Sequence, residues 1–73
     1  MLRASSKPIQ LNSSNIKSVV YDEKAHALTV EFHSTHRYKI HNVTNAEYSG
    51  LLNAASPGKY FAAQLRDKRH TEL

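Results

Sequence analysis

The stretch LTVEFHSTHRYKIH, residues 28–41, decides the fold of this 73-residue chain. Apolar and polar residues alternate strictly in residues 28–33 and again in residues 37–41. Because successive side chains of a β-strand point to opposite faces of a sheet, each run predicts a strand with one buried and one solvated face. The polar segment Ser34-Thr35-His36 lies between the two runs and predicts a turn, so the two strands are expected to pair antiparallel.

The residues before this stretch predict a third strand. Residues 16–21 are rich in β-branched and aromatic side chains, and the polar segment 22–26 separates them from the alternation that begins at residue 28. This pattern is typical of a β-hairpin, so we expect a three-stranded antiparallel sheet. Residues 1–12 are predicted to form a flexible basic arm with a short extended stretch at 9–11, and residues 13–73 to form a single domain. The side chains expected to face the core are Leu28, Val30, Phe32, Tyr38 and Ile40.

A strong helix-start signal follows the predicted sheet. Thr44 is a suitable N-cap residue, Glu47 three positions later completes a capping box, and Val43 and Tyr48 occupy the positions of a hydrophobic staple. The apolar residues that follow at helical spacing are Tyr48, Leu51, Leu52 and Ala55. Together these features predict a helix that packs on the apolar face of the sheet.

Ser56-Pro57-Gly58 breaks this helix, and Pro57 suits the first position of a second one. The second helix would carry Phe61 and Leu65 on one face and fray among residues 66–73. The predicted fold class is therefore α+β: a three-stranded antiparallel sheet with one or two C-terminal helices packed on one face.

Composition and charge exclude several classes of protein. The chain has no cysteine, so it has no disulfide framework and no thiolate nucleophile. It has no apolar run near the roughly 20 residues that span a bilayer and no signal-like start, which predicts a cytoplasmic protein. The net charge is +4, and the basic residues are concentrated in the first seventeen residues and in the C-terminal segment after residue 58. The middle of the chain carries slightly more acidic than basic residues, which is unlike a dedicated phosphate-binding surface.

Five histidines suggest a metal site, and the closest spacing is that of His33, His36 and His41. Two of these imidazoles are predicted to lie on the solvated sheet face and one in a turn, with no carboxylate placed to orient the rings. There is also no nucleophile elbow and no glycine-rich phosphate loop, because the chain holds only two glycines. We therefore expect no metal, no cofactor and no catalytic activity.

The order of short motifs resembles that of the KTSC family, named for a domain at the C-terminus of some lysyl-tRNA synthetases. The motifs that carry the resemblance are Ser14-Asn15-Ile16, Val19-x-Tyr21-Asp22, Leu28-x-Val30-x-Phe32, Tyr38-x-Ile40, Tyr48-x-x-Leu51-Leu52 and Ser56-Pro57-Gly58-Lys59-Tyr60-Phe61. The resemblance covers about residues 13–69 and implies RNA binding as one function. Two features depart from the family pattern: a Tyr-x-Tyr centre appears here as Tyr38-Lys39-Ile40, and a glycine is missing from the turn at residues 34–36. The first departure removes half of a possible stacking platform for RNA bases.

In length and domain type the chain is also similar to small transcription regulators of lytic bacteriophages. That resemblance implies binding to host bacterial RNA polymerase, inhibition of promoter initiation and antitermination. The predicted open sheet face is of mixed charge, which suits a protein partner better than a phosphate backbone, and it carries Thr29, Glu31, His33, Arg37, Lys39 and His41. We thus expect a monomeric regulator that binds bacterial RNA polymerase. The alternative is an RNA-binding domain, and a third hypothesis is an accessory protein without nucleic-acid contacts. The expected partner-binding residues are Lys7, Lys17, Arg37, Lys39, His41, Arg66, Lys68 and Arg69.

Overall fold

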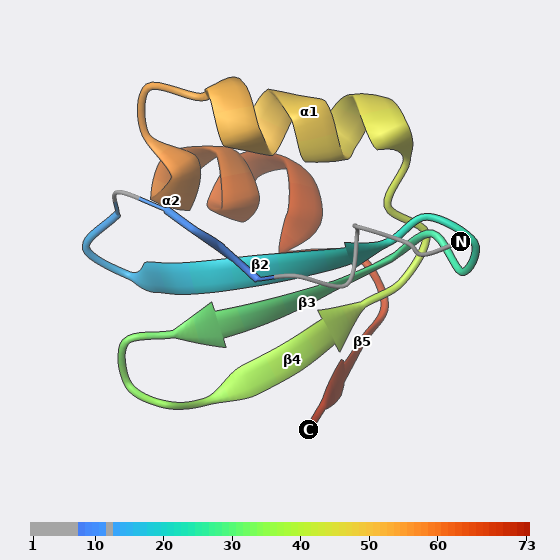
Figure 1. Ribbon diagram of the computed structural model, residues 1–73, viewed down its shortest axis with the longest axis horizontal. Coiled ribbons are helices and arrows are strands. Elements are labelled where there is room, and N and C mark those ends of the chain that lie inside the picture. The colour runs from blue at the N-terminus through green and yellow to red at the C-terminus, as the bar shows by residue number, and fades with distance from the viewer. Residues whose placement is uncertain (1–7, 12) are drawn as a thin grey trace.

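A computed structural model describes residues 8–11 and 13–73 of the chain. The elements in chain order are β1 (Ile9–Gln10), β2 (Ile16–Asp22), β3 (Ala27–Phe32), β4 (Arg37–Ile40), α1 (Asn45–Asn53), α2 (Pro57–Tyr60), η2 (Phe61–Leu65) and β5 (His70–Glu72). The strands form one antiparallel sheet whose spatial order is the order of the sequence. The helices lie together on one side of this sheet, and β5 is the strand farthest from them in the view of Figure 1.

The α+β class is confirmed, but the sheet has five strands rather than the three that were predicted. The two additional strands lie at the edges: β1 pairs with β2, with Ile9 opposite Val19, and β5 pairs with β4, with His70 opposite Ile40. The segment predicted to fray at the C-terminus therefore contains a strand. All three residues of β5 are exposed, so the strand has no apolar alternation that could have predicted it. The predicted extended stretch at residues 9–11 contains β1, whereas residues 1–7 of the predicted arm lie outside the described residues.

The core lies between the sheet and the helices. Cross-strand neighbours Val19 and Val30, and Leu28 and Ile40, bring alternate side chains of three strands onto the same face. The side chains with less than 2% exposure are Ile16, Val19, Leu28, Val30, Ile40, Val43, Leu51 and Leu65. Phe32 and Tyr38, which were also predicted to face inward, pack against this cluster but are only partly buried.

Helix α1 begins as the sequence predicts. The Thr44 Oγ1 accepts a hydrogen bond from the Glu47 amide at 3.1 Å, and the Glu47 carboxylate accepts one from the Thr44 amide at 3.0 Å, so both halves of the capping box are present. The helix ends at Asn53, because Ala54 is already in an extended conformation. Ala55 therefore lies beyond the helix and is exposed, which makes the predicted apolar stripe one residue too long.

The second helical segment begins at Pro57 and changes its winding after Tyr60. Residues Phe61–Leu65 form a π-helix, and the Arg66 amide donates to the Phe61 carbonyl at 2.8 Å across this wider turn. The Tyr60 ring lies against Gly50 of α1, where a Cβ atom would overlap its atoms. A glycine at this position thus allows α1 and α2 to approach each other closely.

Among the described residues, three turn residues other than glycine have positive φ angles: His26 (53°), Thr35 (74°) and Asn42 (60°). Asparagine tolerates this left-handed region, but a β-branched side chain such as that of Thr35 is strained in it. The turn at residues 34–36 has no glycine, but Thr35 adopts the left-handed backbone conformation that a glycine would adopt without strain.

We expect Leu51→Ala to lower the free energy of unfolding by about 2–5 kcal/mol, because it removes a large side chain with no solvent exposure. Phe32→Ala should cost less, since the Phe32 ring is already partly solvated in the folded state. Urea denaturation followed by circular dichroism measures both values. A Leu51→Ala variant as stable as the parent would contradict the packing of α1 on the sheet.

We expect Thr35→Gly to raise the free energy of unfolding by about 1 kcal/mol, because glycine adopts a positive φ without the steric penalty of a Cβ atom. Ser34→Gly is the matched control, because Ser34 has no positive φ and gains nothing from the change. The same urea titration measures both variants. Equal destabilisation by the two substitutions would show that the strain at Thr35 is not released.

Candidate functional site

The face of the sheet opposite the helices is covered by no other element among the described residues (Figure 1). We call it the open face. Side chains that alternate with the core residues lie on it in two transverse rows. The first row comprises Gln10, Ser18, Glu31 and Arg37, and the second comprises Val20, Thr29, Lys39 and Thr71. Both rows mix charged, polar and small residues, so the open face carries no block of one charge.

Three of the predicted partner-binding residues come together on this face. Arg37 and Lys39 alternate along β4, and His41 follows directly after the strand. The His41 Nε2 lies 3.1 Å from the Thr71 Oγ1, which connects the end of β4 to β5. Arg69 is next to this group, because its carbonyl accepts a hydrogen bond from the His41 amide at 2.8 Å.

The other predicted partner-binding residues lie apart from this group. Lys17 is exposed on β2, Arg66 is exposed at the C-terminal end of η2, and Lys7 lies outside the described residues. The seven of these predicted residues that the structure describes thus do not form one patch.

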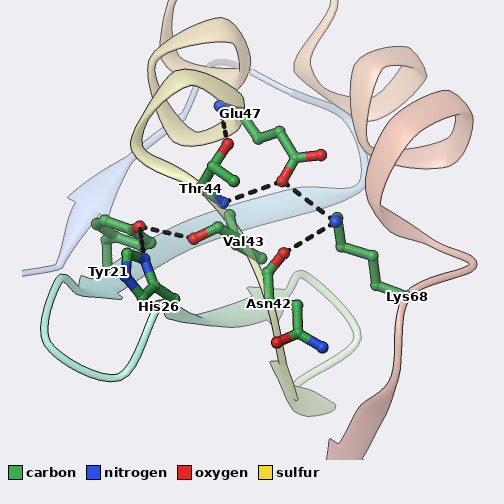
Figure 2. Close-up of polar contacts among 7 residues, drawn as sticks. All are labelled: Tyr21, His26, Asn42, Val43, Thr44, Glu47 and Lys68. Atoms are coloured by element: carbon green, nitrogen blue, oxygen red, sulfur yellow. Dashed lines mark hydrogen bonds and ion pairs between the residues drawn. The ribbon is translucent and has the colours of Figure 1, made fainter.

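Lys68 takes part in a polar network within the fold. Its Nζ lies 3.2 Å from a Glu47 carboxylate oxygen and donates to the Asn42 carbonyl at 2.8 Å, as Figure 2 shows. Burial by itself would raise the pKa of the Glu47 carboxyl, but hydrogen bonds from the Thr44 amide and the Lys68 ammonium group outweigh it and lower this pKa below its ordinary value. The Glu47–Lys68 pair therefore connects the start of α1 to the segment that leads into β5.

A second network holds the same end of the sheet (Figure 2). The Tyr21 hydroxyl donates to the Val43 carbonyl at 2.6 Å and lies 3.4 Å from the His26 Nδ1. The Tyr21 ring stacks on the Tyr48 ring of α1 with the two centroids 4.5 Å apart. Burial raises the pKa of Tyr21, and the nearby carboxylates of Glu23, Glu47 and Asp22 raise it further, so the phenol remains protonated and can donate.

The histidines predicted to stay free of metal are separated from one another. The His33 Nε2 lies 3.0 Å from the Ser13 carbonyl, His36 pairs with Glu72 at 3.5 Å, and His41 contacts Thr71. In residues 8–11 and 13–73, no three His, Asp or Glu side chains converge as metal ligands do.

No helix in the described part of the chain has the length and apolar character needed to cross a membrane.

Sequence reasoning missed a groove on the helix side of the sheet. Two adjoining depressions, of about 470 and 170 Å³, share the lining residues Phe32, Phe61 and Arg66. The motif segments Ser14-Asn15-Ile16 and Ser56-Pro57-Gly58-Lys59-Tyr60-Phe61, which are far apart in the sequence, meet here, and Asn15, Gly58 and Phe61 all line the larger depression. Their shared position was not recognisable from motif spacing, because it depends on how η2 packs on the end of β3.

Fold and surface together define a small α+β domain with helices on one face of an antiparallel sheet and the other face open. A family model described as the KTSC domain matches residues 12–68, so the chain belongs to the KTSC family and the predicted resemblance is confirmed. Among solved structures, the chain is similar to the KTSC domain protein YPO2434 from Yersinia pestis, with a TM-score of 0.87 and 20% sequence identity over 92% of this chain and 96% of that chain. At this identity the match establishes a shared fold. A search of curated proteins finds no match.

The lowered pKa of Glu47 predicts an acid-sensitive contribution to stability. A carboxyl whose pKa is lower in the folded state stabilises the fold fully at pH values above its ordinary value of 4.5, and this contribution is lost as the pH falls through the folded-state pKa. We expect Glu47→Gln to lower the free energy of unfolding at neutral pH by about 0.5–1 kcal/mol, because glutamine keeps the capping box but loses the ion pair with Lys68.

Urea titrations at neutral pH and at about pH 3 measure the effect, and the variant should lose less stability on acidification than the parent. Glu23→Gln is the control for removing an exposed carboxylate. A variant that keeps the full acid sensitivity of the parent would contradict the role assigned to Glu47.

Proposed function

We propose that this protein is a binding module without enzymatic activity that binds bacterial RNA polymerase, inhibits initiation at promoters and favours antitermination. The observation that carries the proposal is the open face, on which Glu31, Arg37 and Lys39 lie among small polar side chains. Charges of both signs in fixed positions favour recognition of a protein surface with a complementary pattern.

The backbone beneath these side chains is rigid in a way that suits recognition. Glu31 is directly opposite Arg37, and Thr29 lies opposite Lys39, so each charged group is positioned by strands that pair on both sides. The contact between His41 and Thr71 adds a side-chain link at the end of β4. Because little conformational freedom is lost on binding, such a face can bind a partner without first being ordered.

The choice of bacterial RNA polymerase is supported by the similarity in length and domain type to small phage transcription regulators. A domain of this kind would act by occupying a surface that the polymerase needs at promoters. Basic residues such as Lys7 and Lys17 would speed the encounter with an acidic partner without determining specificity.

RNA binding is the alternative, and the distribution of cations supports it less. The residues it would use are Lys39, Lys59, Arg66, Lys68 and Arg69. Lys39 lies on the open face, Lys59 lies on α2, and Lys68 is engaged with Glu47. A phosphate backbone requires several cations along one track, and these side chains do not provide one.

The direct test is size-exclusion chromatography of the protein with purified bacterial RNA polymerase, with and without its initiation factor. We expect co-elution at micromolar concentration, and we expect Arg37→Gln and Lys39→Gln each to raise the dissociation rate by roughly tenfold in a surface-binding assay. Lys24→Gln, in the exposed turn between β2 and β3, is the control that removes the same charge away from the open face.

Failure of the protein to bind polymerase in either form would reject the polymerase proposal. Equal effects of Lys24→Gln and Lys39→Gln would show that net charge, and not the open face, determines binding. Selective binding of an RNA with nanomolar affinity at physiological salt would support the alternative instead.

A further inference from the structure

The groove on the helix side of the sheet has a floor of aromatic rings. We call the two adjoining depressions the Phe61 groove; the lining residues that the proposal uses are Phe32, His33, Tyr38, Phe61, Arg66 and His70. The Phe32 ring contacts the Phe61 ring edge-to-face with centroids 5.6 Å apart, and it contacts the Tyr38 ring at 6.0 Å. Tyr38 continues the row to His70, at 5.7 Å. Phe32, Phe61 and Tyr38 are only partly buried, so this row presents apolar surface to a ligand.

The π-helix determines which side chains meet at this groove. The hydrogen bond from the Arg66 amide to the Phe61 carbonyl spans five residues, so Phe61 and Arg66 lie one wide turn apart and both line the two depressions. Leu65 on the same turn has no solvent exposure and anchors it to the core. The wide turn thus places Arg66 and the partly buried Phe61 on the lining of the same groove.

The charge that lines the groove has a single sign. Arg66 lines both depressions, the imidazoles of His33 and His70 each line one, and no acidic residue of the described chain lines either. The Arg66 side chain forms no hydrogen bond or ion pair with the described residues. Glu31 lies on the open face, and Glu47 pairs with Lys68. Glu72 lies opposite Tyr38 on the groove side of the sheet, but it lines neither depression and pairs with His36.

We propose that the Phe61 groove binds an extended segment of a partner protein in which a large apolar side chain lies next to a carboxylate. The apolar side chain packs on Phe32 and Phe61, and the carboxylate accepts hydrogen bonds from the Arg66 guanidinium group, a planar donor suited to this geometry. This inference rests on the proposed function in that the ligand is a protein, and it adds a second contact surface of defined chemistry.

The composition of the groove favours a peptide over a nucleic acid. The two depressions are lined by one arginine and no lysine, whereas a chain of phosphates requires several such cations in sequence. Most of the remaining lining residues are apolar or uncharged and match the alternation of an apolar anchor with a single acid.

A random-peptide display selection on the whole protein tests the proposal. We expect enrichment of sequences that contain a large apolar residue within a few positions of Asp or Glu, and amide chemical-shift changes on binding of a synthesised peptide should centre on Asn15, Phe61 and Arg66. Arg66→Gln should lower the affinity for the synthesised peptide by roughly tenfold. Lys24→Gln, which removes an exposed charge in the turn between β2 and β3, outside the groove, should leave the affinity unchanged within about twofold.

A second peptide, in which Asn or Gln replaces the acidic residue, completes a double-mutant cycle. This peptide should bind the parent protein and the Arg66→Gln variant with equal affinity. The proposal is overturned if the enriched peptides lack an acidic residue, if the shift changes centre on the open face, or if Arg66→Gln and Lys24→Gln weaken binding alike. Tighter, Arg66-dependent binding of single-stranded oligouridylate at the same residues would likewise overturn it in favour of RNA.

These outcomes are distinguishable from failure of the proposed function. Arg66-dependent peptide binding by a protein that does not bind polymerase would support the groove and reject only the polymerase as partner. If the selection enriches no peptide and Arg66→Gln leaves polymerase binding unchanged, the open face is supported as the polymerase-binding surface. The groove is then rejected as a peptide-binding site.

Discussion

The helical layer covers only part of the sheet on which it packs, and the rest of the structure follows from this. Over the middle of β2 and β3 the layer is complete, so Val19, Leu28 and Val30 have no solvent exposure. Towards β5 it ends: Ile40 of β4 is buried, whereas His70, opposite it on β5, is exposed. Tyr38, at the other end of β4, is only partly buried. Apolar residues at the margin must then pack on one another, which is the origin of the row of edge-to-face rings. The opposite face has no covering element in the described chain, so it can remain polar without loss of core.

Polar contacts that fix the helical layer and side chains that line the larger depression of the groove lie at opposite ends of the strands. At the end where β4 leads into α1, Tyr21 bonds the Val43 carbonyl and Glu47 joins the helix start to Lys68. These groups satisfy one another within the fold and therefore contribute to stability rather than to recognition. At the other end Phe32 and Phe61 remain partly exposed, and the guanidinium group of Arg66 has no partner among the described residues. The end held by internal hydrogen bonds thus supports the end that is free to bind.

Local patterns predicted the elements whose causes are local. Strict alternation identified β3 and β4, and the Thr44–Glu47 spacing identified the start of α1, because in both cases the interacting atoms are within a few residues. The strand β5 was missed, since its three exposed residues are extended only through pairing with β4, about thirty residues earlier in the chain. The pairing of Lys68 with Glu47 and the convergence of Asn15 with Phe61 are non-local in the same way. Of the predicted binding residues, Arg37, Lys39 and His41 could be grouped because they alternate on one strand, whereas no pattern distinguished Arg66 in the groove from its neighbours.

The two candidate surfaces are on opposite sides of the sheet, and β5 lies between them. Lys39 and Thr71 are opposite each other on the open face, whereas Ile40 and His70 are opposite each other on the groove side. A single short straight segment therefore cannot contact both, because successive residues of β5 point to different sides. A partner that uses both surfaces has to pass around the β5 edge or present two separate segments. In either case binding at β5 would combine contacts to mixed charges on one side with an apolar anchor and a carboxylate on the other, and the two contributions are separable by substitution at Lys39 and at Arg66.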